Sequence, residues 1–271
     1  MKNPYLIEPP ASINFSGGRS SGFMLHNIIE AYQGDLPEGI EIVFCNTGLE
    51  HKATYDFIHE FSDHYKIKIN WLEYHEDHEG GNSFKIVDYK TASRSGEPFS
   101  QINKKYKRLP NPIYRFCTGI LKIQTSRKFL KSLGWNSWES CVGLRKDETR
   151  RVHKFNQDVN YETSIFPMYE AGHDQNDVNT FWGENTFDLK LPHDSKIWGN
   201  CVGCHLKGVD KLYTIAEEDP NQLQWWVDQE NLHQKRFNNN RPSYEKIIQG
   251  AKNQGSFNFV EEDTIPCFCT D

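Results

Sequence analysis

Residues 11–22 read Ala-Ser-Ile-Asn-Phe-Ser-Gly-Gly-Arg-Ser-Ser-Gly, and this stretch decides the fold class. A short apolar run ends in small residues, and residues 23–29 then carry apolar side chains at helical spacing. This order predicts a strand, a glycine loop and a helix. The glycines allow close approach to a ligand, and the helix N-terminus directs its free amides there. The sequence therefore predicts an anion-binding loop formed by Ser16, Gly17, Gly18, Arg19, Ser20 and Ser21.

The loop alone leaves a plain strand-to-helix turn as an alternative. It lacks the Gly-Lys-Ser/Thr ending of a Walker loop. If it binds phosphate, a bulky residue in place of Gly17 is expected to occupy the phosphate position. A second apolar run, residues 39–45, also ends in a polar turn, formed by residues 46–48. In a parallel sheet both turns lie at the carboxyl ends of strands, where ligands bind.

The remaining pattern predicts an α/β fold, with a parallel sheet flanked by helices on both faces. Further strands are expected at residues 68–74 and 138–143. Helices are expected at residues 51–65, 83–92, 119–133, 175–182 and 209–236, the last broken near Pro220. Residues 237–271 are Asn-rich and are expected to be extended.

Bulk composition limits the class of protein. A chain of 271 residues can bury a full core as one large domain, or as one domain with a small appendage. A net charge of −6 argues against a dedicated electrostatic nucleic-acid binder, but it permits a local basic patch. Residues 104–108 are one candidate, although a solvated surface loop is the favoured interpretation. No signal or membrane-spanning pattern is present, so we expect a cytoplasmic protein without membrane partners.

Seven cysteines need an explanation, because a reducing compartment does not favour disulfides. Cys45 and Cys141 lie inside apolar runs and are expected to be buried structural thiols. Cys201 and Cys204 form a Cys-x-x-Cys between turn residues. The other three lie beside turn-forming or polar residues, and they are Cys117, Cys267 and Cys269.

Four segments together resemble the phosphoadenosine phosphosulfate reductase family of the PP-loop, or adenine-nucleotide alpha-hydrolase, superfamily. They are residues 16–21, 46–50 with Thr54, 115–122, and 143–151. The resemblance implies an adenine-nucleotide-binding PP-loop domain over residues 1–200 and a helical, cysteine-bearing extension over residues 201–271. It also implies that the Ser-Gly-Gly loop holds the nucleotide phosphates. Further nucleotide contacts are expected from Asn46, Thr47, Gly48, Glu50, Arg115, Lys122, Gly143, Arg145 and Arg150.

The same resemblance implies a metal site. In the adenylylsulfate branch of the family, a cysteine pair and a Cys-x-x-Cys hold a [4Fe–4S] cluster. Cys117, Cys201 and Cys204 match three of these ligands, whereas Thr118 stands in the place of the fourth. Cys267 or Cys269 could supply it, or the position could stay open for a substrate or sulfide. A structural zinc and a redox dithiol are the alternatives.

The function expected from the resemblance is adenine-nucleotide-dependent sulfur chemistry. In the leading version ATP adenylylates a nucleic-acid or small-molecule acceptor, and sulfur is then delivered through the cluster of Cys117, Cys201 and Cys204. A donor protein could supply this sulfur. The expected catalytic residues are Cys117, Arg145, Cys267 and Cys269. One alternative is a reductase that releases sulfite from adenylylsulfate or its 3′-phosphate, although the Glu-Cys-Gly-Leu/Ile-His tail of such reductases is lacking. Another is a non-catalytic nucleotide-binding module with a structural zinc. A homodimer is compatible with each.

Overall fold

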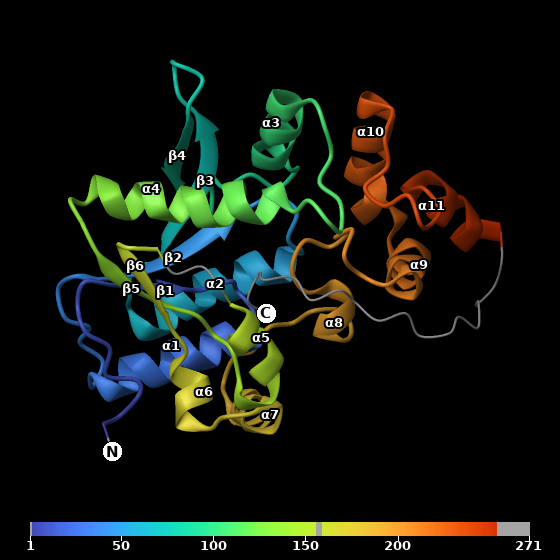
Figure 1. Cartoon of the computed structure of the whole chain (residues 1–271). Coiled ribbons are helices and arrows are strands. Elements are labelled where there is room, and N and C mark those ends of the chain that lie inside the picture. Colours follow the sequence, from blue (N-terminus) through green and yellow to red (C-terminus); the bar gives the residue numbers. More distant parts are fainter. Residues whose placement is uncertain (1, 156–158, 254–271) are drawn as a thin grey trace.

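The computed structural model of the protein describes residues 2–155 and 159–253, and a six-stranded sheet lies at its centre (Figure 1). The strands run in the order β4-β3-β2-β1-β5-β6. All neighbouring strands pair in parallel except β4, which is antiparallel to β3. The sheet is therefore mixed, with one antiparallel edge. Its strands are β1 (Ala11–Asn14), β2 (Ile40–Asn46), β3 (Asn70–Glu76), β4 (Asn82–Val87), β5 (Trp138–Cys141) and β6 (Glu162–Ile165).

Helices cover both faces of this sheet, which confirms the expected α/β architecture. On one face lie α1 (Arg19–Ala31) and α2 (Lys52–Tyr65), whose apolar side chains share a core with β1 and β2. On the other face, η1 (Thr118–Gln124), a π-helix, continues into α4 (Thr125–Ser132) (Figure 1). Phe129 and Leu130 of α4 pack there against Val43 and Leu72 of the sheet.

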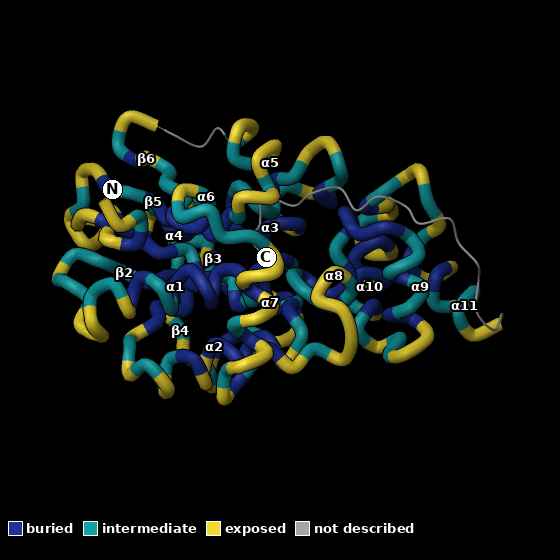
Figure 2. Tube along the Cα trace, turned by 90° about the horizontal axis from the view of Figure 1, so that it is seen from below, coloured by how far each residue is buried: buried dark blue, intermediate teal, exposed yellow. Residues whose placement is uncertain are grey.

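A second hydrophobic cluster lies beside the sheet. It joins residues of α3 (Glu97–Tyr106) and η1 to residues 198–247, so segments far apart in the sequence pack together. Figure 2 shows buried residues both along the sheet and among α9 and α10. The boundary at residue 200 stays a prediction. The remaining helices are η2 (Lys146–Glu148), α5 (Thr149–Lys154), α6 (Pro167–Ala171), α7 (Gln175–Glu184), α8 (Ser195–Trp198), α9 (Val209–Glu218), η3 (Pro220–Leu223), α10 (Gln224–His233) and α11 (Tyr244–Asn253).

Local sequence explains where the principal helices begin and end. Helix α1 starts after Gly18, whose extended backbone precedes the first turn. Helix α2 starts after His51, whose side chain accepts a hydrogen bond from the Ala53 amide, and ends at Lys66 in the left-handed conformation. The break near Pro220 separates α9 from α10, as expected. None of the described helices has the length and apolar character needed to span a bilayer.

Two sequence-based expectations are wrong. Residues 83–92 do not form a helix, because residues 82–87 form strand β4, which pairs with β3 through a turn at Gly80 and Gly81. The region after residue 237 is not wholly extended, because it contains α11. Tyr244 and Ile247 of α11 are buried in the second cluster. This tertiary contact stabilises a helix that the polar sequence around it does not predict. Helix α3 and strand β6 had no predicted counterpart.

Candidate nucleotide-binding site

A pocket of about 700 Å³, counting its open mouth, lies where β1 and β5 end. From β1 the chain passes through α1 to β2 on one side, whereas β5 pairs with β1 on the other. This is the switch point of the sheet, where α/β proteins bind ligands. The lining residues are Asn14, Phe15, Ser16, Val43, Phe44, Cys45, Thr118, Lys122, Ile123, Ser126, Ser140, Val142, Phe155 and Glu162.

The serines of the candidate anion-binding loop hold its shape. The Ser21 hydroxyl accepts a hydrogen bond from the Ser16 amide at 3.2 Å and lies 2.9 Å from the Ser16 hydroxyl. It donates to the Gly18 carbonyl at 3.0 Å. Gly18 has no side chain with which to cap α1, so the first-turn amides remain directed at the loop. Ser16 belongs to the pocket lining and connects this loop to the pocket.

Two glycines, Gly17 and Gly143, allow close packing around the loop. The expectation that a side chain at residue 17 would occupy the phosphate position changes. Gly17 has a φ of +77°, and a Cβ there would lie 2.6 Å from Thr54 Cγ2 and 2.7 Å from Ile58 Cδ1. A side chain at residue 17 therefore meets α2 first, and not the phosphate position. A Cβ on Gly143 would lie 3.2 Å from Ser21 Cα, so this glycine brings the segment after β5 against the loop.

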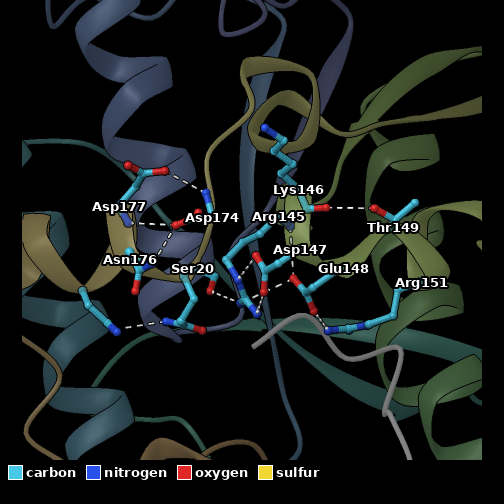
Figure 3. A network of polar contacts seen from close by, with 12 residues as sticks. Ser20, Arg145, Lys146, Asp147, Glu148, Thr149, Arg151, Asp174, Asn176 and Asp177 are labelled. Atoms are coloured by element: carbon cyan, nitrogen blue, oxygen red, sulfur yellow. Dashed lines mark hydrogen bonds and ion pairs between the residues drawn. The ribbon is translucent and has the colours of Figure 1, made fainter.

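The two arginines nearest the loop are engaged by carboxylates. Arg19 Nε donates to Asp188 Oδ1 at 2.8 Å, and its Nη2 pairs with the other carboxylate oxygen. Arg145 Nη1 donates to the Ser20 hydroxyl at 2.8 Å, while its guanidinium also pairs with Asp147 and Glu148 (Figure 3). Arg145 is thus placed to position the loop through Ser20.

Other predicted cations lie at different distances from the pocket. Lys122 lines it, from the π-helix η1. Arg150 is exposed on α5. Arg115 precedes η1, and its Nε donates to the Pro112 carbonyl at 3.1 Å. Lys122 is therefore the predicted nucleotide-binding cation that reaches the pocket itself.

The turn after β2 is ordered by internal hydrogen bonds. Asn46 is fully buried, and its amide donates to Glu73 Oε1 at 2.7 Å and to the Ser93 carbonyl at 2.9 Å. Its Oδ1 accepts from the Gly48 amide at 2.9 Å. Gly48 has a φ of +80°, and a Cβ there would lie 2.7 Å from the Gly96 amide nitrogen. In this structure Asn46 and Gly48 support the turn from within.

A buried carboxylate joins this turn to the Cys-x-x-Cys segment. Glu50 accepts hydrogen bonds from the Thr47 hydroxyl at 2.8 Å and the Tyr55 hydroxyl at 3.1 Å. The Cys201 thiol lies 3.3 Å from the Thr47 hydroxyl and donates to Glu50 at 3.9 Å. Val202 N donates to the Leu49 carbonyl at 2.9 Å. Burial and the Glu50 charge raise the pKa of Cys201 well above its usual range, so this thiol stays protonated.

The three candidate metal ligands all contact the second hydrophobic cluster, and their convergence on one site stays a prediction. Cys117 and Cys204 pack against the second hydrophobic cluster, of which Cys201 is a member. Burial, and next the charge of Arg241, lower the pKa of His205 to about 3, and Arg115 contributes as well. Within residues 2–155 and 159–253, however, no three His, Cys, Asp or Glu side chains are grouped to hold a metal ion. Cys267 and Cys269 lie outside the described residues.

Sequence reasoning missed the role of Cys45. This thiol is half-buried and not fully enclosed, and it belongs to the pocket lining. It donates to the Lys122 carbonyl at 3.5 Å. Cys141, in contrast, is fully buried as expected. The signal for Cys45 was its place at the end of β2, one residue before the polar turn.

These features define an α/β protein with a ligand pocket at the switch point of a mostly parallel sheet. Residues 10–171, more than half of the chain, match the phosphoadenosine phosphosulfate reductase domain, and the chain belongs to that family. The family membership expected from the four sequence segments is thereby confirmed.

Two relatives found by sequence comparison are described as uncharacterized proteins. An uncharacterized nin region protein of Escherichia phage lambda is 28% identical over 218 residues, which cover 78% of this chain and 71% of that protein. An uncharacterized protein of Methanocaldococcus jannaschii is 28% identical over 176 residues. That match covers 62% of this chain but 31% of the archaeal protein, so the chain spans about a third of that relative.

Two solved structures share parts of the fold. The phosphoadenylyl-sulfate reductase of Candida auris, in a phosphate complex, is 15% identical with a TM-score of 0.40, covering 67% of this chain and 75% of that one. The U34-tRNA thiolase of Methanococcus maripaludis, with its [4Fe–4S] cluster, is 15% identical with a TM-score of 0.42, covering 91% and 73%. At these scores the likenesses carry no argument about substrate or cofactor.

Proposed function

We propose that the protein binds ATP in the switch-point pocket and uses it to adenylylate an acceptor for sulfur transfer. The observation that carries this proposal is the switch-point pocket, whose lining joins Ser16 of the glycine loop to Lys122 of η1. Apolar side chains such as Val43 and Val142 line the same pocket and suit a base, while the loop and the lysine suit phosphates.

The chemistry asked of these residues is charge stabilisation. An acceptor oxygen attacks the α-phosphorus, the bond from that phosphorus to pyrophosphate breaks, and pyrophosphate leaves with the electron pair. The first-turn amides of α1 and the Lys122 ammonium would balance the charge that develops on the departing oxygens. Arg145 would act indirectly, because it holds Ser20. Hydrosulfide then attacks the activated acceptor, a bond to sulfur forms as the bond to the AMP oxygen breaks, and AMP leaves with the electron pair.

The second candidate is a reductase that releases sulfite from adenylylsulfate or its 3′-phosphate, and family membership favours it. The two reactions differ in their products, because adenylylation yields pyrophosphate and AMP, whereas reduction yields sulfite. The third candidate, a nucleotide-binding module with a structural zinc, yields neither. Product analysis with purified protein therefore separates all three.

An iron–sulfur cluster, with zinc as the alternative, remains a proposal for Cys117, Cys201 and Cys204. Thiolates are suitable ligands for both, and a bound cluster would supply iron-held sulfur or electrons. The described side chains do not fit such a group as they stand, since no three ligands are grouped and the Cys201 thiol donates to Glu50. No step above therefore depends on it. Iron, sulfide and zinc assays after anaerobic purification test the proposal.

Calorimetric titration tests the nucleotide proposal. ATP is expected to bind, and Lys122→Ala is expected to weaken binding about 10- to 100-fold, since a hydrogen bond to a charged group is lost. Lys128→Ala is the matched control, because Lys128 is an exposed lysine on the continuing helix α4 and is absent from the pocket lining. Equal affinities of the wild type and Lys122→Ala for ATP would contradict the proposed site.

A further inference from the structure

The loop between α3 and η1 is ordered by internal hydrogen bonds and has an exposed tip. The Asn111 side chain accepts hydrogen bonds from the amides of Ile113, at 3.0 Å, and Tyr114, at 2.8 Å. The Asn111 amide in turn donates to the Tyr114 carbonyl at 3.1 Å. Pro110 and Pro112 restrict the backbone on either side of Asn111. The turn therefore presents a fixed arrangement of side chains.

Two large side chains stand out at this tip. Ile113 is 96% exposed and Tyr114 is 49% exposed, although a fold of this size can bury such residues. The Arg108 guanidinium lies 4.2 Å from the Tyr114 ring centroid and 5.3 Å from that of Phe116. Its Nη2 also donates to the Tyr114 hydroxyl at 3.0 Å. Arg108 thus covers part of the Tyr114 ring, and the Phe116 ring lies 5.8 Å away between centroids, which leaves the tyrosine side chain half exposed.

Charge is one-sided along the stretch of sequence that carries the tip. Residues 98–138 contain no Asp or Glu, in a chain whose net charge is −6. Some of their cations are used internally, since Lys105 lies near Glu76 and Arg127 pairs with Glu162. Lys104, in the last turn of α3, and Lys107, directly after it, are in contrast exposed. The nine cations of the stretch are Lys104, Lys105, Lys107, Arg108, Arg115, Lys122, Arg127, Lys128 and Lys131.

We propose that single-stranded nucleic acid binds on this surface, which we call the tip surface and define as Lys104, Lys107, Arg108, Ile113, Tyr114 and Arg115. Exposed lysines meet the phosphates, and an unpaired base stacks on Tyr114. A base in a duplex is already stacked and offers no free face, so the tyrosine selects single strands.

The inference rests on the proposed function, because it names the class of acceptor for the same pocket. The tip surface leads directly into η1, whose Thr118 and Lys122 line the pocket. Tyr114 precedes Thr118 by four residues, so a strand held at the tip lies close to the pocket lining along the chain. The tip surface and the pocket lining are thus joined by a short stretch of the same segment.

Fluorescence anisotropy with the full chain and a labelled mixed-sequence single strand of about 20 nucleotides tests this inference, at salt concentrations from about 50 to 200 mM. Tyr114→Ala is expected to weaken binding about 5- to 100-fold, whereas Tyr114→Trp keeps a stacking ring and retains affinity. The double variant Lys104→Ala/Lys107→Ala is expected to reduce the salt-dependence slope by about 1.4, for two lost phosphate contacts. Leu232→Ala, at another exposed apolar residue, is the control for Tyr114→Ala.

The double variant Lys246→Ala/Lys252→Ala, on α11, is the matched charge control and is expected to bind like the wild type. Wild-type affinity in Tyr114→Ala would overturn the inference. So would equal competition by duplex, or by polyglutamate, which would indicate recognition of charge alone or an acidic protein partner. A separate ATP titration distinguishes the two proposals. ATP binding without strand binding refutes the tip surface, and strand binding without ATP binding refutes the proposed function.

Discussion

Replacing Gly17 with alanine should lower the stability of the protein, because the new side chain strains the glycine loop against α2. The φ of +77° is unfavourable for alanine by about 1–2 kcal/mol. The new Cβ would also lie 2.6 Å from Thr54 Cγ2 and 2.7 Å from Ile58 Cδ1, an overlap that costs about 1–3 kcal/mol. Together these effects reduce the free energy of unfolding by about 2–5 kcal/mol, a large part of the usual 5–15 kcal/mol.

Urea denaturation followed by circular dichroism measures this effect. With a slope of about 3 kcal/mol/M, the midpoint of Gly17→Ala should fall by about 0.7–1.7 M. Gly18→Ala is the matched control, because Gly18 has a φ of −94° and a ψ of 162°, which alanine readily adopts. Adding Thr54→Ser to Gly17→Ala removes Cγ2 and should restore part of the loss. Identical midpoints for wild type and Gly17→Ala would refute the reasoning.

Three further predictions concern other residues. Brief iodoacetamide labelling, read out by peptide mass spectrometry, should modify Cys45 of the pocket lining, and bound ATP should slow this reaction. Cys201 should stay unmodified, because burial raises the pKa of its thiol. Labelling of Cys45 at the same rate with and without ATP would contradict the proposed pocket. Arg127→Met should lower stability by about 3–5 kcal/mol in urea denaturation, since it leaves the Glu162 carboxylate buried and unpaired. Burial lowers the pKa of His205 to about 3, so between pH 6.5 and 3 the unfolded chain binds a proton that the folded chain does not. The free energy of unfolding should therefore decrease as the pH is lowered from 6.5 to 3, and His205→Phe should make this decrease smaller.

Local periodicity was sufficient where an element contributes one regular apolar face. Residues 51–65 carry a clear helical stripe, and α2 spans Lys52–Tyr65 as expected. The same reasoning failed for residues 82–87, which form the edge strand β4. Because its residues are mostly exposed or half-buried, its sequence has no apolar alternation that predicts a strand. Its pairing with β3 is a tertiary fact, and the Gly80-Gly81 turn was its one local sign.

The candidate site shows the same division. The small residues of the loop predicted its place between β1 and α1, because backbone conformation depends on local sequence. What the side chains contact could not be predicted, because their partners come from distant segments. Arg19 meets Asp188, and Cys201 meets Glu50, across separations of 169 and 151 residues. The sequence therefore identifies a cation or a thiol in a motif, but it does not predict which carboxylate that group pairs with in the fold.

The π-helical hydrogen bonding of η1 has a consequence for comparing relatives. In a π-helix the hydrogen bonds join residues five apart, so the turn that begins after Cys117 and contains Lys122 holds one residue more than an α-helical turn. In an α-helix, residues four apart have that relation. A homologue with one residue fewer between this cysteine and lysine, and an ordinary α-helix there, would keep both side chains in place. A single-residue gap in an alignment at this point should accordingly be treated as a change in helix type, with the cysteine and lysine positions still equivalent.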